Sequence, residues 1–300
     1  MSINIGKFIQ NFDYYLGRKI LSSPKFLSYS LFDNYVFNRI STELLKDSFL
    51  KSFNKDGFVT ISLKDKTTIS DIISEIQIQN QNLDSESKKK VFFYNINNNI
   101  YYLVKKLLES ELSGYLNNIS KYFKGSVFLT ELDIQKKDEF DINLDTNFHV
   151  DYYTCNYFKI FVSLSDITEF CGPTEIIPKY LTRKFIKTVG YKSIYNTNTK
   201  KKNLSDIKYI YKNISKIGDV LLFNSPTVLH KAGVPSKGNF RLLLRMTFVI
   251  DYVNEIKDIF YYYKKNIGHE KSRDLAKPKN FGRTLQLFKS YKRGINKYIY

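Results

Sequence analysis

The chain contains three histidines, and two of them are placed where they could bind a metal ion together with an acid. Asp151 follows His149 by two residues in the strand-like stretch NFHVDYY, and residues i and i+2 of a strand project from the same face. His230 ends a second expected strand, GDVLLFNSPTVLH. If these strands lie side by side, two imidazoles and a carboxylate meet, as in the facial triad of non-haem Fe(II) oxygenases. Such a triad leaves two coordination positions for a bidentate co-substrate and one for dioxygen.

An arginine that could anchor such a co-substrate follows His230 by eleven residues. Arg241 belongs to the apolar strand FRLLLRMTFVI, where a guanidinium is costly to bury without a partner. A carboxylate that accepts two hydrogen bonds would supply that partner. Because alternate residues of a strand share a face, Arg245 is a second candidate for the same role.

Each of these residues also has a purely structural interpretation. A single His-x-Asp pair is more often a surface or structural feature, and a histidine at the end of a strand is more often a satisfied structural residue. Arg241 could pair with an ordinary Asp or Glu. The metal interpretation is favoured by the conjunction of the motifs, which uses two of the three histidines. The remaining one, His269, lies in a basic region and is assigned no role.

In these motifs, the sequence resembles the phytanoyl-CoA dioxygenase family of Fe(II)- and 2-oxoglutarate-dependent oxygenases, which have a double-stranded β-helix core. The resemblance covers about residues 55–250 and is closest in 149–178 and 218–247. Its pieces are the His149-Val150-Asp151 triplet, FKIFVSLSDITEFCGPTEIIP, and GDVLLFNSPTVLHKAGVPSKGNFRLLLRMTF. KDGFVTI resembles the segment that opens the family's domain.

The resemblance implies a role for each candidate residue. Iron would be bound by His149, Asp151 and His230, and the distal carboxylate of 2-oxoglutarate by Arg241. Phe161 aligns with an aromatic position beside the co-substrate. The implied reaction uses dioxygen to hydroxylate a C–H bond of a small organic substrate and releases succinate and carbon dioxide. Related halogenating enzymes have a small residue in place of the acid, so Asp151 favours hydroxylation.

The sequence departs from the family pattern at two places. The family usually continues its Gly-Pro strand with Pro-Gly-Ser-His, whereas this chain has Pro178-Lys179-Tyr180-Leu181, so that turn and the mouth of the substrate site are expected to differ. Ala232 stands where a small hydroxyl residue often follows the distal histidine by two positions. The alanine removes one hydrogen bond to the co-substrate and leaves iron binding untouched.

Hydrophobic periodicity predicts one α+β domain. Helices are expected in 1–50, from a cap at Thr68 or Ser70 through Ile78, and from Ile100 to Leu112 after an Asn-rich loop at 95–99. Between 125 and 250, short β-type runs follow one another without a helix, which indicates a sandwich or barrel. Together with the resemblance, this predicts a double-stranded β-helix (jelly-roll, cupin-like) core over 55–250, flanked by helices from the N-terminal part and the C-terminus.

Three segments are expected to be additions to this core within a single dioxygenase domain of residues 1–300. They are an N-terminal helical extension (1–50), a basic insertion expected to be a long loop (180–217), and a basic C-terminal extension that is helical in part (253–300). The insertion contains the run Lys200-Lys201-Lys202.

The charge balance is strongly positive: 47 Lys and Arg face 29 Asp and Glu, a net charge of +18 over 300 residues. Such a surface attracts phosphates, nucleic acid or anionic lipid. Lys outnumbers Arg and no compact Arg-rich motif occurs, so no specific nucleic-acid partner is expected. The basic segments favour an anionic small-molecule substrate. Two other functions stay open, namely a basic nucleic-acid- or membrane-surface-binding protein without catalysis, and a catalytically silent family relative.

The remaining features concern the compartment. Two cysteines, Cys155 and Cys171, cannot form a disulfide framework, and there is no CxxC motif or Cys/His cluster for zinc. No stretch approaches the ~20 apolar residues that a membrane helix needs. The N-terminus has no continuous apolar core like that of a secretory signal. We therefore expect a soluble cytoplasmic protein without a transmembrane segment, and the sequence does not predict its oligomeric state.

Overall fold

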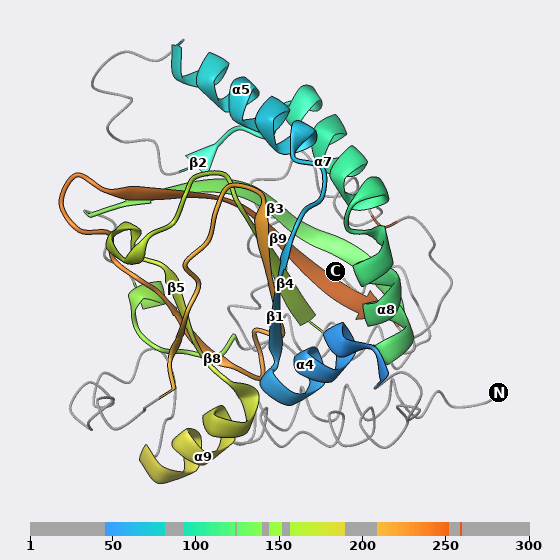
Figure 1. The fold of residues 1–300 in the computed structure, drawn as a ribbon, viewed down its shortest axis with the longest axis vertical. Helices are drawn as coiled ribbons and strands as arrows, with labels where there is room; N and C mark the ends of the chain where they lie inside the picture. Colours follow the sequence, from blue (N-terminus) through green and yellow to red (C-terminus); the bar gives the residue numbers. More distant parts are fainter. Residues whose placement is uncertain are drawn as a thin grey trace, which may run out of the picture.

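The computed structural model describes residues 46–81, 93–123, 125–139, 144–151, 157–189, 209–251 and residue 259. Within these residues, helices cover one face of a six-stranded antiparallel sheet, and a three-stranded antiparallel sheet lies on its other side (Figure 1). The expected α+β class is confirmed at this level. Most of the predicted N-terminal and C-terminal extensions, 1–45 and 260–300, lie outside the described residues.

The described residues before position 124 contain four helices: α4 (Ser48–Asp56), α5 (Thr67–Gln81), α7 (Asn98–Ser110) and α8 (Ser113–Phe123). Asp47 caps α4 by accepting hydrogen bonds from the backbone N–H groups of Phe49 and Leu50. The helix ends at Gly57, whose φ of 78° lies in the left-handed region that glycine adopts most readily. Strand β1 (Phe58–Ser62) follows directly.

Two details of the expected helices were wrong. Helix α5 begins at Thr67, and the side chain that accepts from its first N–H is Asp65, not Thr68 or Ser70. Thr68 is buried in the first turn instead. The Asn-rich loop is shorter than expected, because Asn97 accepts a hydrogen bond from the N–H of Ile100 and so starts α7 inside the Asn run.

The six-stranded sheet has the order β1-β7-β4-β9-β3-β2. Its two longest strands, β3 and β9, pair over almost their whole length. The bounds of the strands other than β1 are β7 Asp219–Phe223, β4 Tyr157–Ser163, β9 Phe240–Asp251, β3 Ser126–Asp138 and β2 Phe93–Tyr94.

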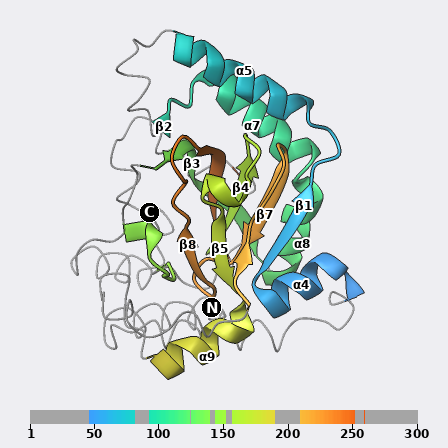
Figure 2. The ribbon, with the colours of Figure 1, turned by 60° about the vertical axis from the view of Figure 1, so that its left-hand side comes forward.

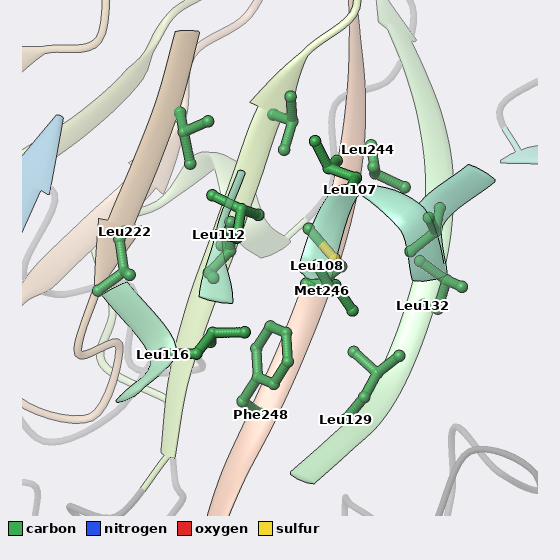
Figure 3. Close-up of a cluster of buried hydrophobic side chains, with 14 of the residues drawn as sticks. Leu107, Leu108, Leu112, Leu116, Leu129, Leu132, Leu222, Leu244, Met246 and Phe248 are labelled. Carbon is green, nitrogen blue, oxygen red and sulfur yellow. The ribbon is translucent and has the colours of Figure 1, made fainter. Parts of the chain in front are cut away.

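One face of this sheet packs against the helices and forms the main hydrophobic core. Alternate residues of β9 point to that face, namely Leu242, Leu244, Met246 and Phe248. They meet leucines of α7, α8 and the turn between these helices. Figure 3 shows Leu244, Met246 and Phe248 together with Leu222 of β7 and Leu129 and Leu132 of β3. The intervening residues of β9 therefore face the other way, toward the small sheet.

A β-bulge in β3 sets which of its residues face the small sheet. The register with β9 shifts between Leu129 and Glu131, so that the extra residue, Thr130, resets the alternation. Leu129 and Leu132 both reach the core although they are three positions apart. The residues of β3 that face away from the core after the bulge are Glu131, Asp133, Gln135 and Lys137.

The small sheet has the order β6-β5-β8, with β6 Tyr211–Lys212, β5 Thr174–Ile177 and β8 Leu229–Ala232. Helix α9 (Lys179–Val189) covers its outer face, where Leu181 and Phe185 pack against Ile177 and Leu229. Figure 2 shows α9 at the far end of the molecule from α5. Two short 3-10 helices, Leu144–Thr146 and Glu169–Cys171, complete the elements of the described residues.

The structure corrects two expectations here. The segment 180–217 was expected to be a long loop, but it contains most of α9, whose apolar side chains pack on the small sheet, and β6, which belongs to that sheet. Residues 190–208 lie outside the described residues. The expected strand that ends in His230 is two strands. Strand β7 ends at Phe223, a turn closed by the hydrogen bond from Thr227 N to Asn224 O follows, and β8 carries the histidine.

None of the helices in the described ranges combines the length and the apolar character needed to cross a membrane.

Candidate metal centre

His149, Asp151 and His230 come together between the two sheets. His149 pairs with His230 as an antiparallel bridge, in which the backbone N–H of each donates to the carbonyl of the other at 2.9 and 2.8 Å. Asp151 N donates to Ser225 O, so the His149–Asp151 segment runs beside β8 without forming a regular strand. Val150 points outward into the cluster under α9, and the two residues that flank it point inward. The predicted i, i+2 geometry is therefore present, although only the bridge at His149 is β structure.

The candidate ligand atoms of the three side chains lie within 4.8 Å of one another. Asp151 Oδ1 is 3.8 Å from His149 Nε2 and 3.9 Å from His230 Nε2. Both histidines are buried, with 7% and 5% of their surface exposed. Such spacing leaves room for an ion in contact with all three atoms.

Backbone carbonyls fix the orientation of both imidazoles. His149 Nδ1 lies 2.8 Å from the carbonyl oxygen of Asn147, and His230 Nδ1 lies 3.0 Å from that of Val228. A carbonyl oxygen can only accept, so each Nδ1 carries the proton and each Nε2 presents its lone pair to the site. In both cases the carbonyl belongs to the residue two positions before the histidine. The sequence predicts that such partners exist but does not identify them.

The charges of the site suit a cation. Burial alone would raise the pKa of Asp151, but attraction to Lys159, His230 and His149 outweighs it and holds that pKa well below its usual range. Burial, with repulsion from His149 and Lys159, lowers the pKa of His230 to about 3. The acid is therefore ionised and His230 is neutral near pH 7, which are the protonation states that metal ligation requires.

Lys159 is a residue of this site that the sequence analysis missed. It projects from β4, and its Nζ lies 2.5 Å from Asp151 Oδ2. A signal was available, because alternation in β4 places Lys159 on the same face as Phe161, which the resemblance implicates. The resemblance implies no role for a lysine at this position, so the alternation of β4 alone would have had to identify it.

The triad opens into a cavity of about 110 Å³ between the two sheets. Charged and polar side chains from the inner face of the large sheet line much of it, together with residues of the small sheet. Besides the triad and Lys159 the lining residues include Glu131, Asp133, Gln135, Lys137, Asp145, Phe161, Thr174, Lys231, Ala232, Arg241, Leu243, Arg245 and Thr247.

The two candidate arginines both line this cavity but have different partners. Arg245 makes a two-pronged ion pair with Asp133, with Nε–Oδ1 and Nη2–Oδ2 distances of 2.7 and 3.0 Å. Burial opposes its charge, but Asp133, Asp145 and Glu131 outweigh burial and raise the pKa of Arg245. Arg241 is 3% exposed, and its Nη1 donates to the uncharged backbone carbonyl of Gly172.

The backbone at Gly172, whose carbonyl accepts from Arg241, lies in close contact with the backbone at Gly233. A Cβ added to Gly172 would lie 2.6 Å from Pro235 N and 2.7 Å from Gly233 O, and its φ of 65° is left-handed. A Cβ on Gly233 would lie 2.5 Å from Pro173 O. The loop after β4 and the loop after β8 can therefore approach this closely only because both residues lack a side chain.

The other predicted positions also lie at the cavity. Phe161 contacts Phe223 edge-on at 5.1 Å between ring centroids, and Phe223 contacts His230 in the same way at 5.1 Å. Ala232 lines the cavity without a hydroxyl, as the sequence requires, but Thr174 lies opposite it in the β5–β8 register and lines the same cavity. The third histidine, His269, lies outside the described residues.

Comparisons with known proteins give a likeness in backbone only. No protein-family model matches the sequence, and no curated protein matches it significantly. The epimerase SnoN in complex with Fe3+, alpha ketoglutarate and nogalamycin RO shares 14% identity over 69% of this chain and 83% of its own, with a TM-score of 0.48. HygX from Streptomyces hygroscopicus with nickel and 2-oxoglutarate bound shares 15% over 70% and 87%, with a TM-score of 0.46.

A third solved structure, the nickel complex of the non-haem monooxygenase ThoJ, shares 10% identity over 83% of this chain and 100% of its own, with a TM-score of 0.46. Identities and TM-scores this low transfer no role to individual residues. The side chains of this chain are what carry a functional argument.

Proposed function

We propose that this chain is a non-haem Fe(II)- and 2-oxoglutarate-dependent dioxygenase with a double-stranded β-helix core, similar to the phytanoyl-CoA dioxygenase family, and that it hydroxylates a C–H bond of a small organic substrate. The observation that carries the proposal is the meeting of two imidazole Nε2 atoms and one carboxylate oxygen at the wall of a cavity that also contains a buried arginine. The two facing antiparallel sheets, with the triad between them, support the proposed core.

His149, Asp151 and His230 fit a divalent iron ion. Neutral imidazoles and a carboxylate on one side of an ion are the donor set of non-haem Fe(II) oxygenases. The carbonyls of Asn147 and Val228 hold the imidazole lone pairs toward the site before any ion arrives. When bound, iron with 2-oxoglutarate and dioxygen supplies the oxidising chemistry, with succinate and carbon dioxide as by-products.

Arg241 is the proposed anchor for the distal carboxylate of 2-oxoglutarate. Arg241 follows His230 by eleven residues, as in the family that the sequence resembles, whereas Arg245 directs two of its donors to Asp133. A buried guanidinium beside a cavity attracts an anion strongly and binds a carboxylate with defined geometry. Thr174 brings a hydroxyl to the cavity from β5, opposite Ala232. Ala232 stands at the position where the family often has a hydroxyl residue.

Apolar and aromatic side chains also lie at the proposed reacting centre. The aromatic series of Phe161, Phe223 and His230 closes one side of the centre. Leu243, which is 2% exposed, packs between the positions of Arg241 and Arg245 on β9. A partly dry cavity strengthens the charge interactions that orient an anionic co-substrate.

Succinate release tests this proposal. Full-length protein is incubated with Fe(II), ascorbate and 2-oxoglutarate, with and without a library of small metabolites. We expect turnover in the wild type and its loss in His149→Ala and in His230→Ala, because each variant removes one of three metal ligands. His269→Ala is the matched control, since it removes the one histidine without a predicted role, and it should keep wild-type turnover.

Three results would contradict the proposal. Unchanged succinate release from His149→Ala or His230→Ala would exclude the triad. A wild-type protein that binds the metal but never consumes 2-oxoglutarate would favour the catalytically silent relative. Steeply salt-dependent DNA binding without metal binding would favour the basic binding protein instead.

The expectation of an anionic substrate depends on the basic segments 180–217 and 253–300, of which 190–208, 253–258 and 260–300 lie outside the described residues. The single-domain organisation, the cytoplasmic location and the lack of a specific nucleic-acid partner stay predictions.

A further inference from the structure

The two oxygens of Asp151 have different neighbours. Oδ1 faces both imidazoles, at 3.8 Å from His149 Nε2 and 3.9 Å from His230 Nε2. Oδ2 lies 2.5 Å from the ammonium nitrogen of Lys159. One oxygen is therefore directed at the position of an ion, and the other is held by a cation that projects from the large sheet.

The large sheet directs Lys159 to this contact. In the register, Lys159 lies between Phe223 of β7 and Thr247 of β9. Its neighbours Phe158 and Ile160 are fully buried in the main core, so the alternation of β4 leaves Lys159 no direction except toward the cavity. The side chains of Lys159 and Asp151 are only 18% and 13% exposed. Solvent and salt therefore screen this ion pair less than a surface pair.

We propose that Lys159 is a positioning residue that holds Oδ2 of Asp151, so that the carboxylate offers a metal ion Oδ1 alone. The inference rests on the metal site of the proposed function and adds to it a residue that does not touch the ion. A carboxylate can bind a metal ion through one oxygen or through both. With Oδ2 held by Lys159, the protein would offer the ion three ligand atoms, and its other coordination positions would be open to co-substrates.

Removal of Lys159 should therefore change the metal site in two ways that act in the same direction. The carboxylate gains a second oxygen for the ion, and a positive charge close to that ion disappears. Both changes strengthen metal binding, while the second carboxylate oxygen takes a position that 2-oxoglutarate would use. A lysine that merely supported the fold would have the opposite effect, because its loss would disorder the ligands and weaken metal binding.

Co(II) is a suitable probe, because its visible absorption reports the number of ligands and needs no turnover. Metal-free full-length protein is titrated with Co(II), and 2-oxoglutarate is then added. We expect Lys159→Met to bind Co(II) about tenfold more tightly or better, with an altered visible spectrum, and to bind 2-oxoglutarate about tenfold more weakly. Lys159→Arg restores a cationic donor and should return the spectrum to that of the wild type. If Lys159→Met does not fold, Lys159→Leu replaces it, because leucine also lacks a donor for Oδ2, with the same expected direction of both affinities.

Lys231→Met is the matched control. Lys231 also lines the cavity, but its ammonium group pairs with Glu175 at 3.1 Å, whereas that of Lys159 pairs with Asp151. Lys231→Met therefore removes the same charge from the same cavity without releasing Oδ2 of Asp151. An equal rise in Co(II) affinity in both variants would reduce the effect to cavity charge and overturn the proposal, as would an unchanged spectrum or weaker Co(II) binding in Lys159→Met. A chain that shows the expected Co(II) behaviour but never consumes 2-oxoglutarate would keep this inference and lose the proposed function.

Discussion

The two faces of strand β9 differ in almost every physical respect. Leu242, Leu244, Met246 and Phe248 point toward the helices and lie in the main hydrophobic core. Arg241, Leu243, Arg245 and Thr247 point toward the small sheet and line the cavity. The same twelve-residue strand therefore separates an apolar layer that holds the fold together from a charged layer that surrounds the candidate metal centre.

This difference explains how buried charges are tolerated in the middle of a sheet. The inner-face charges are placed beside opposite charges or backbone acceptors, as in Arg245 with Asp133 and Arg241 with Gly172 O. The helix-facing side of β9, called its outer face below, needs no such partners. The burial of its apolar groups offsets the cost of holding charges on the opposite, inner face. Substitutions on the two faces should therefore affect different measurements.

The largest expected effect on stability is on the outer face. Phe248 is fully buried and stacks on Phe158 with 5.0 Å between ring centroids. Phe248→Ala should lower the free energy of unfolding by about 3–5 kcal/mol, since it leaves a cavity in a packed core. Urea unfolding of metal-free protein measures this. Thr247→Val, one residue away on the inner face, loses only the hydrogen bond to Glu131 and should cost about 1 kcal/mol. Equal losses would show that the two faces do not differ as described.

Much of this two-faced arrangement could be predicted from the sequence. The alternation in FRLLLRMTFVI places Arg241 and Arg245 on one face, and the structure has them there. The bulge at Thr130 could not be predicted, because an inserted residue leaves no mark in the composition of SVFLTELDI and yet decides which face Glu131 and Asp133 occupy. Helix α9 was missed because its many basic residues obscured the helical spacing of Leu181 and Phe185.

The next largest effect should separate the two arginines of the inner face. Arg241→Met should weaken 2-oxoglutarate binding by about 10- to 100-fold, the loss expected for a charge-assisted, two-pronged hydrogen bond, and should leave metal affinity nearly unchanged. Arg245→Met should affect stability more than co-substrate binding, because it leaves the partly buried Asp133 without its ion-pair partner. Calorimetric titration of 2-oxoglutarate into each metal-loaded variant measures the co-substrate affinity, and urea unfolding measures the stability.

A double variant controls for the loss of the ion pair. Arg245→Met with Asp133→Asn removes both charges and should recover part of the stability lost in Arg245→Met. If Arg245→Met weakens 2-oxoglutarate binding and Arg241→Met does not, the anchor is Arg245, and the contact of Arg241 with the Gly172 carbonyl is purely structural.

The candidate site was predictable to a different degree from the fold. The triad follows from residue types and spacing, since few arrangements use two of three histidines with an acid at i+2. What the sequence could not supply is how the ligands are held. The carbonyls of Asn147 and Val228 are backbone groups with no sequence signature, and the contact between Lys159 and Asp151 joins residues of separate elements. Such contacts depend on the register of strands, which spacing alone does not fix.

The smallest expected effect lies in the helical layer that covers the outer face. Asn97 caps α7 through the 2.8 Å hydrogen bond from Ile100 N, and its side-chain amide also donates to Glu75 at 3.3 Å. Asn97→Ala should lower the free energy of unfolding by about 1 kcal/mol, the usual cost of losing an N-cap. Asn99→Ala is the matched control, because it removes a similar 3.2 Å contact with Glu75 without touching the cap. Neither variant should change Co(II) affinity, since α7 reaches the metal centre only through a packed sheet. A change in Co(II) affinity in Asn97→Ala alone would mean that the position of α7 is transmitted through β9 to the inner face, and the two faces would then have to be treated as one coupled unit.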